Sequence, residues 1–198
     1  MHPHWHSASP EIQRKLLSLF IQSLAPKSPA RPFSPEPLAF LNAFENEITL
    51  TRSPHDVAAV LRWGIRHLQL EGNCFGNDEQ WYKIFFDDER SSNHPINSYS
   101  TMLGPRLPPS HLELLNVTLE LLSYLAARAE ANGISGSKLS KTFGLWLLTS
   151  ERANGEDDWP TFYNRWDQAG RMLEHLFLAR IRYVFAHILC SFLTFIFA

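Results

Sequence analysis

The chain has 198 residues, of which 44% are hydrophobic and 19% are charged, and its formal net charge is −2. This composition is typical of a folded domain and excludes an intrinsically disordered chain. The small net charge also argues against a strongly basic surface, so no nucleic-acid partner is expected. Two cysteines, Cys74 and Cys190, form neither a disulfide framework nor a zinc motif, which predicts a reducing, cytoplasmic setting.

Helical patterns begin close to the amino terminus. A helix is predicted from Pro10, a residue well suited to a first helical position, through Leu24. Several prolines interrupt residues 26–37, and this segment is predicted to be loop or extended chain. A short helix is expected at residues 38–45.

Residues 53–68, "SPHDVAAVLRWGIRHL", have the features of a capped amphipathic helix. Ser53 is the predicted N-cap, and Asp56 favours the positive end of the helix dipole. Arg62 and Arg66 lie one turn apart and share a side of this helix, so they predict a local basic surface.

The next helix is predicted at residues 77–89, "NDEQWYKIFFDDE". It ends in three consecutive acidic residues, which we interpret as a solvated helix end: Asp87, Asp88 and Glu89. Residues 88–107 are polar, and an irregular connection is expected there.

The second half of the chain is predicted to be helical as well. A long amphipathic helix covers residues 111–132 and ends at Gly133, a C-cap residue. A packing helix follows in "NGISGSKLSKTFGLWLL" (residues 132–148), and a final helix starts near Trp159. Six aromatic side chains are expected to fill the core between the last helices: Trp146, Trp159, Phe162, Trp166, Phe177 and Tyr183. About six to eight helices in total predict an all-α, bundle-like domain.

The two ends of the chain differ from its middle. Three alternating histidines at the amino terminus (His2, His4 and His6) could bind a metal, but we expect neither a functional metal site nor a cofactor. Residues 183–198 carry no charge; as a helix they would be about 24 Å long, shorter than a bilayer core of about 30 Å. The predicted organisation is an N-terminal helix and tail (1–24), a helical domain (25–182) and an apolar extension (183–198).

The order of these helices carries a resemblance. "LRWGIRHL", then "WYKIF", then "RLPPSHLELLNVTLELLSYLAARAEANGISGSKLSKTFGLWLL" follow at spacings that resemble the GTPase-activating (RhoGAP) domain of Rho-family regulators, over residues 53–149. Within that superfamily, the chain is most similar to the fungal domain of bud-emergence suppressor and meiotically up-regulated proteins, over residues 24–182. The resemblance implies a RhoGAP-like helical bundle and a role in fungal cell polarity.

The resemblance also implies roles for particular residues. In RhoGAP domains a loop arginine enters the nucleotide site and accelerates GTP hydrolysis by about 10³–10⁵. The corresponding loop here lacks the family motif, so Arg31 is only a weak finger candidate. The basic residues of the first matched helix correspond to Arg62 and Arg66, and the family's helper asparagine corresponds to Lys138. These three cations form the predicted partner-binding surface.

Three hypotheses follow. The leading one is a catalytically degenerate RhoGAP-like domain that binds a Rho-type small GTPase or a polarity scaffold and has no enzymatic activity of its own. In the second, the domain is an active GTPase activator that uses Arg31 or a remodelled loop. The third, not favoured, is a membrane-associated helical protein held by residues 183–198. The first implies a cytoplasmic protein at sites of polarised growth, such as the cell cortex or bud neck.

Overall fold

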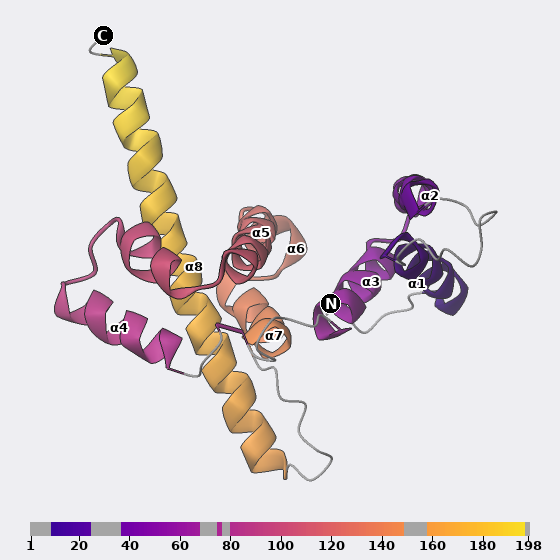
Figure 1. Cartoon of the computed structure of the whole chain (residues 1–198), viewed down its shortest axis with the longest axis horizontal. Helices are drawn as coiled ribbons and strands as arrows, with labels where there is room; N and C mark the ends of the chain where they lie inside the picture. Colours follow the sequence, from indigo (N-terminus) through magenta and orange to yellow (C-terminus); the bar gives the residue numbers. More distant parts are fainter. Residues whose placement is uncertain (1–8, 25–36, 68–74, 77–79, 149–157, 197–198) are drawn as a thin grey trace. The chain divides into compact units, whose positions relative to one another are not determined.

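The structure is a computed structural model that describes residues 9–24, 37–67, 75–76, 80–148 and 158–196. Every secondary-structure element in these ranges is helical: eight α-helices, one π-helical turn and one 3-10 turn (Figure 1). The prediction of an all-α protein is therefore confirmed for the described part of the chain. The chain divides into two compact units, Met1–Leu68 and Gln69–Ala198, which are described separately.

Three helices form the first unit: α1 (Pro10–Leu24), α2 (Pro37–Leu50) and α3 (Pro54–His67). The helices α1 and α2 pack together around the fully buried Leu16 and a ring contact between Phe20 and Phe44, whose centroids are 5.4 Å apart. The predicted bounds of α1 and α3 agree with the structure, while α2 continues beyond the expected residue 45. The prolines predicted to form a loop lie largely outside the described residues.

A buried carboxylate joins the beginnings of α1 and α3. Asp56 in the first turn of α3 is only 1% exposed, and its Oδ1 accepts a hydrogen bond from the backbone N–H of Ser9 at 2.6 Å. Ser9 immediately precedes α1, so the carboxylate satisfies a backbone donor at the start of that helix. The sequence predicted Asp56 near a helix dipole but not this contact between helices.

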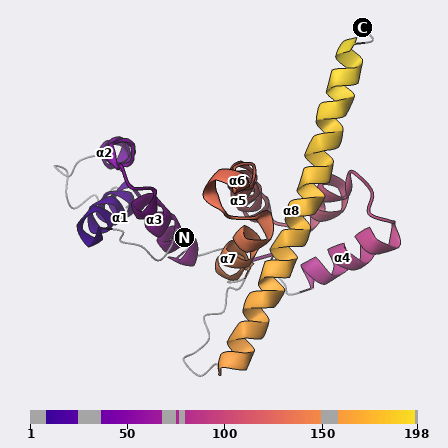
Figure 2. The same ribbon diagram turned by 180° about the vertical axis from the view of Figure 1, so that it is seen from behind.

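Five α-helices belong to the second unit: α4 (Trp81–Ser91), α5 (Pro109–Ala126), α6 (Ala129–Asn132), α7 (Gly136–Leu148) and α8 (Trp159–Ile196). The long helix α8 is the axis of this unit, with α4 on one side and α5 and α7 on the other in both views (Figures 1 and 2). Its buried residues Leu173 and Leu176 are part of the core. An amphipathic stripe on one continuous helix thus organises the shorter helices around it.

Helices α7 and α8 approach closely because glycines lie between them. A Cβ atom added to Gly144 of α7 would lie 2.4 Å from the carbonyl oxygen of Ala169 in α8. The predicted packing face of α7 is confirmed, since Leu139, Phe143 and Leu147 are all buried. The absence of a side chain at Gly144 lets the two backbones come together in a way that no larger residue allows.

The connection between α4 and α5 is more ordered than the sequence predicted. It contains a π-helical turn, η1 (Tyr99–Leu103), and a 3-10 turn, η2 (Gly104–Arg106). Leu103 is fully buried and Leu107 nearly so, so the segment contributes to the core rather than crossing its surface. The predicted C-cap at Gly133 is confirmed by its left-handed φ of 69°, although the helix is interrupted after Ala126.

The six aromatic residues expected in the core differ in burial. Phe177 is 5% exposed and belongs to the core, whereas Trp159, at the start of α8, is 73% exposed. The other four are half-buried: Trp146, Phe162, Trp166 and Tyr183. The expectation is wrong for Trp159, because the first turn of α8 has no helix packed over it in the described structure.

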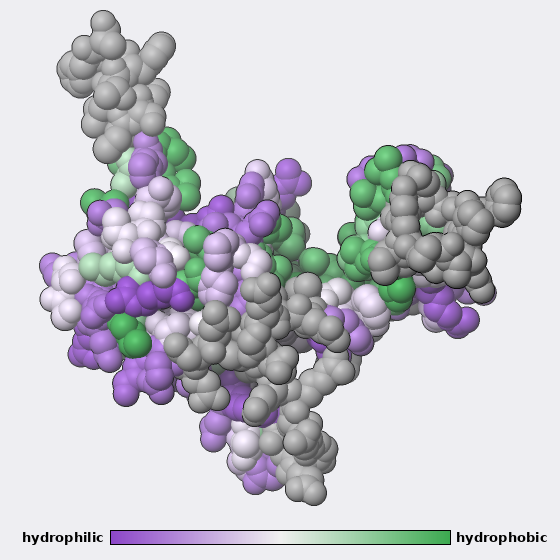
Figure 3. All heavy atoms as spheres, in the orientation of Figure 1, coloured by the Kyte–Doolittle hydropathy of each residue, from purple (hydrophilic) through white to green (hydrophobic). Residues whose placement is uncertain are grey.

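The apolar C-terminal run continues α8, which extends without a break to Ile196. Figure 3 shows apolar residues on this helix just before its grey end, and Phe185 and Ile188 there are 62% and 60% exposed. Among the helices of the described residues, none combines the length and apolar character needed to cross a bilayer. The domain boundaries expected at residues 24/25 and 182/183 stay predictions.

Candidate functional site

A buried carboxylate, Glu89, lies at the centre of the most extensive polar cluster in the second unit. Glu89 belongs to the acidic run at the end of α4 that was interpreted as a solvated helix end, and for this residue the interpretation is wrong, since Glu89 is 0% exposed. Its neighbour Asp87 is exposed, and Asp88 forms an ion pair with Arg106. Three consecutive acidic residues therefore have three different environments.

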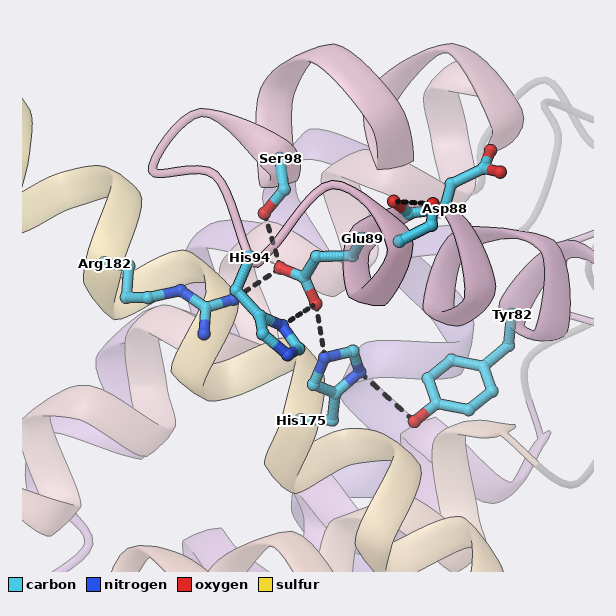
Figure 4. A network of polar contacts seen from close by, with 8 residues as sticks. Tyr82, Asp88, Glu89, His94, Ser98, His175 and Arg182 are labelled. Atoms are coloured by element: carbon cyan, nitrogen blue, oxygen red, sulfur yellow. Dashed lines mark hydrogen bonds and ion pairs between the residues drawn. The ribbon is translucent and has the colours of Figure 1, made fainter.

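Four side chains contact the Glu89 carboxylate (Figure 4). Its Oε1 accepts a hydrogen bond from Ser98 Oγ at 2.5 Å and forms an ion pair with Arg182. Its Oε2 lies 2.5 Å from His175 Nε2 and 3.5 Å from His94 Nδ1. The two oxygens thus have separate partners: a hydroxyl and a guanidinium on one, two imidazoles on the other.

The positions of these partners follow from helix geometry and one tight turn. His175 and Arg182 are seven residues apart on α8, which is about two helical turns, so they lie on one face. After α4, Asn93 and His94 both have a left-handed backbone, with φ of 59° and 52°. The N–H of His94 donates to the carbonyl of Glu89 at 2.8 Å, and this turn brings the His94 ring back over the carboxylate.

Tyr82 extends the cluster along α4. Its hydroxyl lies 3.2 Å from Nδ1 of His175, so a chain of contacts runs from Tyr82 through His175 to Glu89 (Figure 4). Burial, and then the charge of Glu89, raises the pKa of Tyr82 to about 12, and the phenol therefore stays protonated at neutral pH. Tyr82 is seven residues before Glu89, which places both on the same face of α4.

Burial and charge act in opposite directions on the pKa of the central pair. Burial by itself raises the pKa of Glu89, but the Ser98 hydrogen bond and the charges of His175 and Arg182 outweigh it, so the pKa lies below its ordinary value of 4.5. Burial lowers the pKa of His175 below 6.5, and the attraction of Glu89 offsets only part of this effect. At neutral pH the cluster therefore holds an ionised carboxylate next to a neutral imidazole.

A hollow of about 440 Å³ lies next to this cluster, on the side of Tyr82. Its lining comes from α4 and the first half of α8: Tyr82, Phe86, Asn164, Asp167, Gln168, Arg171 and Met172. The cations of this region are already partnered, since Asp167 binds both Lys141 at 3.3 Å and Arg171 at 2.8 Å. The hollow thus offers mainly apolar walls and amide groups.

The residues of the predicted partner-binding surface lie on two helices of different units. Arg62 is half-buried and Arg66 exposed on α3 of the first unit, and Lys138 is exposed on α7 of the second. Arg31, the weak finger candidate, lies outside the described residues. The shared groove formed by these cations therefore stays a prediction.

Sequence reasoning missed the histidines of the Glu89 cluster. A signal existed, because Tyr82 and Glu89 are spaced by seven residues, as are His175 and Arg182. Polar residues repeated at this spacing on an otherwise apolar helix face point to a partner in the core. The spacing could not predict that Glu89 of α4 contacts His175 of α8, because these residues are 86 positions apart in the sequence.

The fold and this internal polar cluster define an all-α domain whose central helix is held by buried charges. Residues 9–188 match the family model of the meiotically up-regulated protein Msb1/Mug8 domain. Because the match covers most of the chain, the chain belongs to this family, which links it to bud emergence and meiosis in fungi. Comparisons with curated proteins and with solved structures gave no match.

Proposed function

We propose that this chain is a RhoGAP-like module that binds a Rho-type small GTPase, or a polarity scaffold, without accelerating GTP hydrolysis. The three segments on which the likeness to RhoGAP domains rests are helical in the described structure, in the expected order: α3, then α4, then α5 to α7. Membership of a bud-emergence and meiotic family supports a partner in polarity signalling. The module would act in the cytoplasm at sites of polarised growth.

The observation that carries this proposal is the two-sided character of α7. One side is buried through Leu139, Phe143 and Leu147, whereas Lys138 in the first turn is exposed. The helix is thus held firmly by its core face while it presents a cation to solvent, as a partner-binding helix requires. Lys138 in the second unit, and Arg62 and Arg66 in the first, each provide positive charge that complements an acidic GTPase surface.

The contacts of several arginines in the second unit support a module without catalytic activity. A finger needs a guanidinium that is free to enter a nucleotide site. In the described part of the second unit, Arg106, Arg180 and Arg182 each bind a group of their own unit. Lys138 also replaces the family's helper asparagine, and an ammonium group donates hydrogen bonds but cannot accept one. Arg31 is the candidate that the likeness to RhoGAP domains gives for an active form.

Binding can be measured with a panel of purified fungal Rho-type GTPases, each loaded with GDP or with a non-hydrolysable GTP analogue. The double variant Arg62→Glu/Arg66→Glu and the single variant Lys138→Glu are each expected to weaken binding at least about tenfold. Matched charge reversals at other exposed cations, Arg14→Glu in α1 and Lys83→Glu in α4, are expected to leave it unchanged. Equal loss in all four variants would show a non-specific charge effect and contradict the proposed surface.

GTP hydrolysis separates the leading proposal from an active GTPase activator. Multiple-turnover hydrolysis by the same panel is expected to remain at its intrinsic rate when the chain is added. An acceleration greater than about tenfold that disappears in Arg31→Ala would establish the alternative, an arginine-finger activator.

A further inference from the structure

Glu89, His94 and His175 offer three metal-ligating atoms in one place. One carboxylate oxygen and one ring nitrogen from each histidine all lie within 4.8 Å of one another. Two imidazoles and one carboxylate are a common donor set for zinc, with a further position left for water or another ligand. The residues come from α4, the turn that follows it, and α8, so the group depends on the tertiary fold.

We propose that Glu89 Oε2, His94 Nδ1 and His175 Nε2 bind a divalent transition-metal ion of the zinc class. Imidazole ligands select such ions over magnesium and calcium, which require oxygen donors. The ion would join the turn after α4 to the central helix α8. It would also neutralise the side of the carboxylate that the guanidinium of Arg182 does not contact.

Two distances to Glu89 Oε2 can be compared with this assignment, while the two imidazole nitrogens lie within 4.8 Å of each other. Ligand atoms of a tetrahedral zinc ion, each about 2.0–2.1 Å from the metal, lie roughly 3.3 Å from each other. His94 Nδ1 and Glu89 Oε2 are 3.5 Å apart, close to that separation. His175 Nε2 and Glu89 Oε2 are 2.5 Å apart and share a hydrogen bond, which the metal would replace as the ring moves outward by roughly 0.8 Å.

The surrounding contacts prepare the ligand atoms. Tyr82 lies 3.2 Å from Nδ1 of His175, so when a metal takes the place of the Nε2 proton, Nδ1 can carry the ring proton and donate it to the phenol oxygen. Ser98 and Arg182 both contact Oε1 and leave Oε2 for the metal. Such contacts fix the orientation of ligands in metal sites.

The His94 turn sets the position of the third proposed ligand. Its backbone is left-handed at two successive residues, Asn93 and His94, a conformation that is uncommon in non-glycine residues but enriched for asparagine and histidine. The His94 side chain is 46% exposed and its Nδ1 lies 3.5 Å from Glu89 Oε2, so this pair contributes little stability by itself. In the proposed site, the left-handed turn places the His94 ring where it can coordinate the metal. The exposed side of this ring lets the ion enter from solvent.

Arg182 and the amino-terminal histidines determine how the test is designed. The Arg182 guanidinium repels a cation, so affinity is expected to be weaker than in a four-ligand structural zinc site. His2, His4 and His6 can bind metal independently of the fold. Titrations therefore use a full-length background chain in which these three histidines are replaced by alanine, after removal of metals with a chelator.

Zinc binding is measured by calorimetry, and cobalt binding by the visible absorption that reports tetrahedral coordination. The background chain is expected to bind one equivalent of each ion. His94→Ala, which truncates an exposed side chain, should weaken binding at least about tenfold while circular dichroism shows an unchanged fold. His67→Ala, at an exposed histidine of α3, is the matched control and should bind normally.

His175→Ala provides a second ligand variant, and a folded His175→Ala protein should also lose binding. If that variant unfolds, His94→Ala decides alone. Absence of zinc and cobalt binding by the background chain would overturn the proposal. Binding that survives in His94→Ala with unchanged affinity would overturn it too, because the three-ligand geometry requires that ring.

Discussion

Glu89 Oε2 and His175 Nε2 lie 2.5 Å apart, although 86 residues separate them in the sequence. This contact joins α4 to α8 through a carboxylate that is completely buried. A buried carboxylate is costly unless both of its oxygens have hydrogen-bond or charged partners. Here Ser98 and Arg182 are the partners of the other oxygen, Oε1. The cluster therefore fixes how α4 lies on the central helix, in a way that apolar packing alone does not specify.

Removal of the Glu89 charge is the most direct test of this arrangement. Glu89→Gln keeps the shape of the side chain but leaves Arg182 without its anion, and breaking a buried pair costs about 3–5 kcal/mol. Because Arg182 is 36% exposed and can reach water, a value near the lower end is expected for the loss in free energy of unfolding. Urea unfolding followed by circular dichroism measures it.

The matched control for this substitution is Asp87→Asn, which removes a carboxylate of the same acidic run. Asp87 is exposed, so the free energy of unfolding is expected to change by no more than about 0.5 kcal/mol. Similar losses in both variants would mean that the general charge of α4, not the buried cluster, determines stability.

The pH dependence of stability follows from His175 and Glu89. Both have a lower pKa in the folded chain than their ordinary values of 6.5 and 4.5, so the unfolded chain binds protons more readily. Their contribution is complete above those ordinary values. It is lost as the pH falls, first below 6.5 for His175 and then below 4.5 for Glu89.

Unfolding free energies measured between about pH 7.5 and about pH 5.5 should therefore fall with acidification, and less steeply in His175→Gln. His187→Gln changes an exposed histidine of the same helix and should keep the slope of the native chain. An unchanged slope in His175→Gln would show that this imidazole does not govern the acid sensitivity.

Two glycines give opposite predictions for the same substitution. Gly144→Ala would place a methyl group 2.4 Å from the Ala169 carbonyl, so α7 and α8 must move apart, at a cost of about 1–3 kcal/mol or more. Gly64 in α3 has no atom within 4 Å of its added Cβ, and Gly64→Ala should stabilise the first unit by about 0.4–1 kcal/mol. Thermal unfolding of the two variants distinguishes the opposite signs.

Most of the helical architecture could be predicted from the sequence because apolar periodicity and capping residues act locally. The starts of α1, α3 and α8, and the cap at Gly133, agree with the prediction for this reason. The η1 and η2 turns could not be predicted, because their polar residues are interspersed with a few deeply buried side chains such as Leu103. Burial there depends on α8, which is distant in the sequence.

The candidate site was much less predictable than the fold. The acidic run ending in Glu89 has the composition of a solvated helix end, and only the tertiary packing of α8 gives that one carboxylate its partners. The cations singled out from the sequence, Arg62, Arg66 and Lys138, were chosen for helix position and family likeness. Their predicted convergence stays a prediction, because Arg62 and Arg66 lie in one unit and Lys138 in the other.

Arg180 and Arg182 are two positions apart on α8, yet one binds the Asn116 carbonyl of α5 and the other the Glu89 carboxylate of α4. In genetic terms, a nonsense or frameshift mutation just before Arg180 would keep α4, α5 and the first half of α8. It would nevertheless remove both guanidinium groups, leaving one buried anion without its main counter-charge. Such an allele should behave as a loss of the whole domain rather than as a loss of its tail.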